Sequence, residues 1–174
     1  IRDQMQTGDL MGFEGEGVIS SLIKVVTGSH ISHVGTILTS MIDGNGLVQI
    51  IESTSLDDGF SGVKINRMAD HVRDYEGKIW WYPLKSELRE KADMSAFTKF
   101  VLEMNGREYD TPQAIFSAIN FIPDQDEDFG KLFCSEMVSQ AYEEAGVIPP
   151  VNASEMTPAD VVAFDIYDEP YLIT

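Results

Sequence analysis

Apolar and polar positions recur with two different periods along the chain, and these periods predict its strands and helices. In residues 17–29 apolar side chains recur every three or four positions, and Gly28 follows as a helix stop. Short apolar runs typical of β-strands occur at residues 7–15, 32–38, 47–53, 62–68 and 77–84. The turn-rich segment MIDGNG joins the second and third of these strands, which predicts a β-hairpin.

The second half of the chain has mainly the helical period. Its predicted helices are residues 87–105, 134–146 and 156–164. The first ends before Gly106, the second begins at Cys134, and the third has Thr157 in the N-cap position. The order of strand, helix, strands and helices, without a repeat or linker, predicts one α+β domain over residues 1–174.

Composition and charge exclude several classes of protein. The chain has 29 acidic and 12 basic residues, and its net charge of −17 repels phosphate backbones and anionic lipid surfaces. We therefore expect no nucleic-acid partner. No apolar run is long enough for a membrane span, and the start IRDQMQTGDL is not that of a signal peptide. The single cysteine favours a reducing compartment, the cytoplasm, although a start at Ile1 leaves an upstream targeting segment open.

Cys134 is the only cysteine, so it forms no disulfide within the chain and no multi-cysteine metal site. Its predicted place is the first turn of a helix, where unpaired N–H groups and the helix dipole stabilise a thiolate. Free cysteine is also among the most buried residue types. Taken alone, the segment LFCSEMVSQAY favours a buried core thiol slightly over a nucleophile.

A cysteine nucleophile needs an imidazole base and a group that orients it. His33 opens an apolar strand, where the edge of a sheet meets a cleft, and is the candidate base. His30 is expected to be a solvated neighbour, and His71, in the polar segment ADHVRDYEG, a surface residue. Glu52 follows two isoleucines at the end of the partner strand and would accept the imidazole N–H, or else face water.

The geometry of the predicted hairpin decides whether His33 and Glu52 can meet. A turn centred on DGNG places Glu52 opposite Ile37, on the same face as His33 but about 13 Å along the strand. Direct pairing needs a midpoint between Met41 and Asp43 instead. The hypothesis therefore predicts an asymmetric loop or a bulge in this hairpin, and a regular hairpin would count against it.

Four segments together carry a family resemblance: TGDLMGFEGEGVISSLIKVVTGSHISHVGTIL, IIEST, GREYDTP and LFCSEMVSQAYEEAGV. In their order and spacing they resemble the circularly permuted papain-like amidases of the NlpC/P60 superfamily, in particular the YiiX/YaeF-like branch. The resemblance covers nearly the whole chain. It implies a papain-like α+β fold with an antiparallel sheet packed against helices and the catalytic cysteine at a helix N-terminus.

The resemblance also implies roles for individual residues. Cys134 matches the nucleophile, His33 the general base and Glu52 the residue that orients it. Tyr109 resembles a tyrosine that lines the site near the oxyanion hole, although the residues after it, DTPQAIF, depart from the family pattern. The backbone N–H of Cys134 would be one oxyanion donor. Asp9 is expected to shape the turn before the first strand.

These expectations describe a cysteine amidase or peptidase that works through an acyl-enzyme. The substrate would be a peptide or isopeptide amide, a peptidoglycan stem, or a lipid-derived amide or ester. A lipid acyltransferase or thioesterase of the same superfamily, and a non-catalytic binding or structural component of a larger assembly, are the alternatives. No cofactor or metal is expected: the acidic run DQDEDFG fails the EF-hand pattern, because Phe129 and Ser135 stand where Gly and Glu are required.

Overall fold

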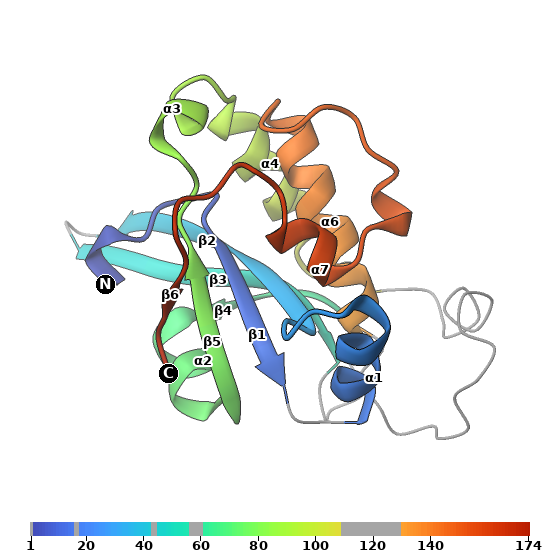
Figure 1. Ribbon diagram of the computed structural model, residues 1–174. Coiled ribbons are helices and arrows are strands. Elements are labelled where there is room, and N and C mark those ends of the chain that lie inside the picture. Colours follow the sequence, from blue (N-terminus) through green and yellow to red (C-terminus); the bar gives the residue numbers. More distant parts are fainter. Residues whose placement is uncertain (1, 16–17, 43–44, 56–60, 109–129) are drawn as a thin grey trace.

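The computed structural model describes residues 2–15, 18–42, 45–55, 61–108 and 130–174 (Figure 1). Its strands are β1 (Leu10–Gly15), β2 (His33–Ile42), β3 (Asn45–Ser55), β4 (Ser61–Arg67), β5 (Gly77–Tyr82) and β6 (Tyr171–Leu172). Its α-helices are α1 (Val18–Thr27), α2 (Met68–Asp74), α3 (Ser86–Arg89), α4 (Met94–Met104), α6 (Gly130–Glu144) and α7 (Pro158–Val162). Short 3-10 helices occupy Arg2–Gln4 and Ala153–Glu155.

The strands form one antiparallel sheet in the order β4-β3-β2-β1-β5-β6. This confirms the predicted α+β class and the antiparallel sheet packed against helices. None of the described helices is both long enough and apolar enough to cross a bilayer.

Alternation along the strands gives the sheet two apolar faces. One face packs against α4, α6 and α7 through a cluster that includes Leu10, Val34, Ile51 and Cys134. The other face, which includes Phe13, Ile37 and Ile50, packs against Met68 of α2. Figure 1 shows α6 and α2 on opposite sides of the sheet. Alternate residues of each strand therefore point to opposite faces of the sheet, one toward α4, α6 and α7 and the other toward α2.

The predicted hairpin is present, but the predicted bulge is not. Strands β2 and β3 pair without interruption from Ile42 opposite Asn45 to Gly35 opposite Glu52, so only residues 43–44 lie between them. The hairpin is therefore regular, and its midpoint comes one residue earlier than the centre of DGNG. This register places Glu52 two residues, rather than four, from the position opposite His33.

Two predicted helix boundaries were wrong, and one helix was not predicted. The segment 87–105 is divided into α3 and α4, because the Asp93 carboxylate accepts the N–H groups of Ser95 and Ala96 and so begins a new helix. The polar segment after β4 forms α2. Helix α6 begins at Gly130, so Cys134 lies in its second turn rather than at its N-terminus.

Candidate active site

His33 is the first residue of β2, and alternation places its imidazole on the α2 face of the sheet. Its Nε2 lies 2.7 Å from Oε2 of Glu52. The pair is buried, with 7% of the His33 side chain and 2% of the Glu52 side chain exposed. The ring also contacts Phe13, with 5.3 Å between the ring centroids. The structure thus brings together two of the three residues singled out in the sequence.

Glu52 reaches His33 across a diagonal of the regular hairpin. The residue opposite Glu52 is Gly35, and His33 lies two positions further along β2. Diagonal neighbours on one face are about 7–8 Å apart at Cα, which long side chains can span. Gly35 leaves the space between them open, because a Cβ there would lie 3.1 Å from the Glu52 Cβ. A bulge is therefore not required for the contact.

The Glu52 carboxylate is held by groups from three elements. In addition to His33 on β2, Oε1 lies 3.2 Å from Nδ1 of His71 on α2 and accepts a hydrogen bond of 3.3 Å from Nδ2 of Asn66 on β4. Burial opposes the charged form, but hydrogen bonds from His33 and Asn66, together with the charges of the two histidines, lower the pKa of Glu52. Glu52 is therefore a carboxylate at neutral pH.

The positive charge of this cluster resides on His33. Burial by itself would lower the pKa of His33, but the neighbouring Cys134 and Glu52 outweigh it and raise this pKa to about 10. Both neighbours act through charge and through hydrogen bonding. Nδ1 of His33, the ring nitrogen that Glu52 does not use, has no partner of standard hydrogen-bond geometry among the described residues. His33 is therefore an imidazolium at neutral pH.

Cys134 reaches this cluster from the opposite face of the sheet. Its side chain is fully buried in the α6 layer, and its Sγ accepts a 3.4 Å hydrogen bond from the backbone N–H of Val34. The pairing of β2 with β3 ends at Gly35, so the N–H of Val34 has no partner strand on that side. It donates to the Cys134 sulfur in place of a β3 carbonyl. The thiol and the imidazole therefore meet at the end of the sheet, around the first two residues of β2.

The later position of Cys134 in α6 corrects one expectation. Only the first four N–H groups of a helix lack an intrahelical partner. Because α6 begins at Gly130, the N–H of Cys134 lies beyond these four and is not the free oxyanion donor that was expected. The dipole effect also declines within the first turn. The polar neighbours of the sulfur are therefore His33 and the Val34 N–H, and not the N-terminus of a helix as predicted.

The other sequence candidates lie elsewhere. Tyr109 is outside the described residues. His30 is exposed and packs edge-on against Trp80, with 5.4 Å between the centroids. Asp9 shapes the turn before β1, as expected, by accepting the Gln6 N–H, and it also accepts the indole N–H of Trp81. These contacts are structural, and none of them involves the His33 cluster.

Sequence reasoning missed His71 and Asn66. His71 was expected at the surface, yet it contacts Glu52 and packs edge-on against Phe13, with 4.9 Å between their ring centroids. A signal was available: Met68, His71, Val72 and Tyr75 have the spacing of one helix face. Asn66 gave no comparable signal, because its closeness to Glu52 depends on the register of β3 with β4.

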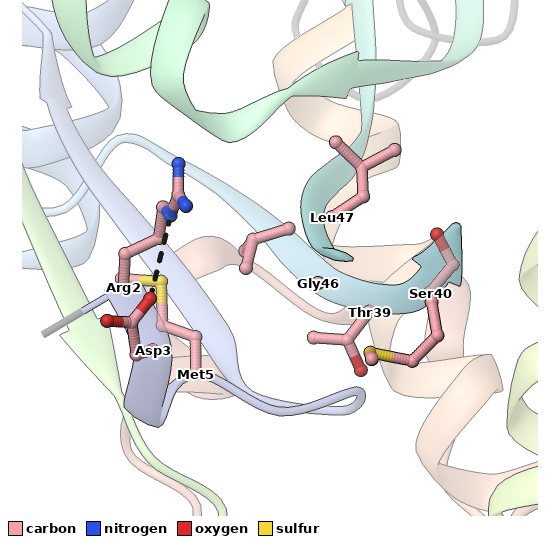
Figure 2. Close-up of a pocket in the computed structure, with 9 residues that line it drawn as sticks. Arg2, Asp3, Met5, Thr39, Ser40, Gly46 and Leu47 are labelled. Carbon is pink, nitrogen blue, oxygen red and sulfur yellow. Dashed lines mark ion pairs between the residues drawn. The ribbon is translucent and has the colours of Figure 1, made fainter. Parts of the chain in front are cut away.

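A separate hollow lies at the far end of the hairpin, where the N-terminal segment meets the tips of β2 and β3. Figure 2 shows Arg2, Asp3 and Met5 on one side of it and Thr39, Ser40 and Leu47 on the other. Its lining contains no histidine or cysteine. Since His33 opens β2 and Ser40 is near its end, this hollow is not part of the His33 cluster.

Comparison with known proteins identifies the fold. No family model matches the chain, and no curated protein matches it. Among solved structures, the metalloprotein YiiX from Escherichia coli O157:H7 matches with a TM-score of 0.53 and 23% sequence identity, over 82% of this chain and 67% of YiiX. The chain has the YiiX fold. This likeness supports, at the level of fold, the resemblance to the YiiX/YaeF-like branch seen in the sequence.

The solved YiiX structure is that of a metalloprotein. The described residues of this chain contain no group of three or more His, Cys, Asp and Glu side chains arranged to hold a metal ion. A likeness to YiiX at this identity concerns the fold alone.

Proposed function

We propose that this protein is a cysteine-dependent acyl hydrolase of the amidase or peptidase type. Cys134 is the nucleophile, His33 the general acid and base, and Glu52 the residue that holds the imidazole. The observation that carries the proposal lies at the start of β2, where the imidazole of His33 pairs with Glu52 at 2.7 Å and the N–H of the next residue, Val34, donates to the Cys134 sulfur at 3.4 Å.

The electrostatics favour this reading over a purely structural one. Burial of an imidazole and a carboxylate is costly, and a core cysteine does not require such a pair beside it. An imidazolium next to sulfur favours the thiolate, which is the nucleophilic form. The Val34 N–H adds a hydrogen bond to the sulfur. A scaffold without catalysis would need none of these features.

In the proposed reaction the Cys134 thiolate attacks the acyl carbonyl carbon, and the carbonyl π pair moves to oxygen. When the C–N or C–O bond breaks, the imidazolium of His33 transfers a proton to the leaving group, which gives a thioester and a neutral imidazole. The neutral imidazole then takes a proton from water while the oxygen attacks the thioester. Sulfur leaves as thiolate, and the ion pair is restored.

Nδ1 of His33 is the nitrogen that handles this proton, because Nε2 is bonded to Glu52. Since Cys134 has no exposed surface in this conformation, the acyl group can reach the sulfur only when the covering groups move. The substrate class follows the fold and the thiol chemistry: a peptide, isopeptide, peptidoglycan or lipid-derived acyl compound.

The test is alkylation of the single cysteine with iodoacetamide, followed by mass spectrometry, in the wild type and in His33→Ala. An imidazolium beside sulfur favours the reactive thiolate, so loss of His33 is expected to lower the rate at pH 7 about tenfold or more. His30→Ala is the matched control, because His30 is exposed and outside the cluster. Equal rates in the wild type and His33→Ala, or labelling only in denaturant, would refute the proposal.

Turnover is tested with p-nitrophenyl esters of short acyl chains. The expected result is a burst of one p-nitrophenolate per chain, absent in Cys134→Ser, because a thioester intermediate accumulates on the single thiol. Adding an amine acceptor separates hydrolysis from acyl transfer: the free acid is expected as the main product. Predominant formation of the amide would instead favour the acyltransferase alternative.

A further inference from the structure

The Glu52 carboxylate has a second histidine, His71, whose contact the proposed mechanism does not use. His71 Nδ1 lies 3.2 Å from Oε1 of Glu52, on the side of the carboxylate away from His33. The ring is held between two aromatic side chains, edge-on to Phe13 at 4.9 Å and stacked on Tyr75 at 5.8 Å between centroids. Its position is therefore fixed by packing as well as by the polar contact.

The protonation states of this cluster follow from the partners. An ionised carboxylate only accepts hydrogen bonds, so a ring nitrogen 3.2 Å from Glu52, as Nδ1 of His71 is, is expected to carry a proton. Neutral His71 is then the tautomer protonated at Nδ1, and its Nε2 carries a lone pair. That Nε2 is buried and has no hydrogen-bond partner among the described residues. Burial, followed by the charge of His33, lowers the pKa of His71 although Glu52 acts against this.

The two histidines therefore differ in charge and in role. His33 carries the positive charge, and neutral His71 lies 3.2 Å from Oε1 of Glu52 without placing a second charge beside it. A glutamate side chain has three rotatable torsions, and a carboxylate bonded on one oxygen only can rotate. With Oε1 held by His71 and Asn66, the orientation of Oε2 toward Nε2 of His33 is fixed from the other end.

We propose that His71 is a positioning residue that acts on His33 through Glu52. The inference rests on the proposed cysteine chemistry. It extends the triad by one residue from α2, on the opposite side of the sheet from α6. Asn66 assists through its longer contact of 3.3 Å, and its effect is expected to be smaller.

The experiment compares His71→Leu with His71→Asn. Leucine keeps an apolar side chain against Phe13 and Tyr75 but removes the donor, whereas the asparagine amide can place an N–H near the position of Nδ1. Because a hydrogen bond to a charged group has a large effect, His71→Leu is expected to lower kcat and the alkylation rate of Cys134 about ten- to hundredfold, with KM unchanged. His71→Asn is expected to stay within about threefold of the wild type.

Controls separate positioning from folding and from the proposed function. His30→Leu is the matched change at an exposed histidine, and thermal unfolding is measured for every variant. Asn66→Ala provides a second variant that does not alter α2, with an expected loss of about threefold. A His71→Leu protein with native stability and the wild-type rate would overturn the inference, as would equal losses in the Leu and Asn variants.

The double variant tests whether His71 acts through Glu52. In a Glu52→Gln background, His71→Leu is expected to cause no further loss, because the carboxylate that it orients is gone. Fully additive losses would show that His71 does not act through Glu52 and would overturn the inference. If His33→Ala also leaves the cysteine fully reactive, the proposed function itself fails; if only the His71 results disagree, the triad stands without its fourth member.

Discussion

Glu52→Gln is the substitution that tests the charge distribution of the site most directly. Glutamine has nearly the shape of glutamate, but its amide offers one acceptor and one NH2 group where the carboxylate offers two acceptors. In the wild type the two carboxylate oxygens lie close to three nitrogens: Nε2 of His33 at 2.7 Å, Nδ1 of His71 at 3.2 Å and Nδ2 of Asn66 at 3.3 Å. The NH2 group of Gln must therefore face at least one of these donors, and the charge opposite His33 disappears.

The size of the effect follows from burial and bond geometry. Hydrogen bonds to charged groups contribute about 1.5–3 kcal/mol, and removing one partner of a buried ion pair costs about 3–5 kcal/mol. Since Gln can still accept from His33, we expect the free energy of unfolding to fall by about 2–3 kcal/mol. Both charged partners have less than a tenth of their side chain exposed, so solvent screens this interaction little.

The dependence on pH has a definite sign. The pKa of Glu52 is lowered in the folded state, so its contribution to stability is present above its ordinary pKa of 4.5 and is lost as the pH falls. The pKa of His33 is raised from 6.5 to about 10, so its contribution is complete below pH 6.5 and is lost as the pH rises through about 10. The difference between wild type and Glu52→Gln is therefore largest between pH 4.5 and 6.5.

Urea unfolding at pH 5.5 and at pH 10 measures this difference. Glu103→Gln is the control, because Glu103 is an exposed residue whose distance to Lys99 is 3.9 Å. Such a surface pair is expected to contribute little at either pH. A Glu52→Gln protein as stable as the wild type at pH 5.5, or a destabilisation that is the same at both pH values, would refute the imidazolium–carboxylate pair.

Two further substitutions test how the sheet supports the site. Asp9→Ala is expected to lower the free energy of unfolding by about 3–5 kcal/mol, because it leaves the buried indole N–H of Trp81 without its acceptor and the largely buried Arg89 without its carboxylate partner. Urea unfolding followed by tryptophan fluorescence measures this, and a loss below about 1 kcal/mol would contradict it. Gly35→Ala would place a Cβ 3.1 Å from the Glu52 Cβ, so we expect a loss of about 1–3 kcal/mol together with slower alkylation of Cys134. Gly46→Ala, at an open position of the same hairpin, should have neither effect.

The elements could be predicted because their periods are local. The apolar runs of β2 and β3 and the apolar face of α4 are set by neighbouring residues, and the predicted segments overlap the observed ones. The start of α6 could not be placed in the same way. In the sequence Gly130 follows the acidic run DQDEDF and was predicted to belong to it, although no residue between Gly130 and Cys134 is a helix breaker.

The register of the hairpin illustrates the limit more clearly. The segment MIDGNG contains two dipeptides that favour tight turns, Asp43-Gly44 and Asn45-Gly46. The structure leaves residues 43–44 between the strands and pairs Asn45 with Ile42. Choosing between two adjacent turns depends on the packing of both sheet faces, which no local pattern contains. The pair of His33 and Glu52 was expected, but the geometry that forms it was not.

The position of His33 at the strand end explains how one side chain can serve two faces of a sheet. Glu52 and His71 lie in the layer of α2, whereas Cys134 belongs to the layer of α6. Two positions further along, at Gly35, β2 is paired on both sides, and a side chain there is confined to the α2 layer. At position 33 only β1 remains as a neighbour, so the imidazole can bond Glu52 on its own face while it interacts with the sulfur on the other. The early end of the β2–β3 ladder is thus the structural condition for the proposed chemistry.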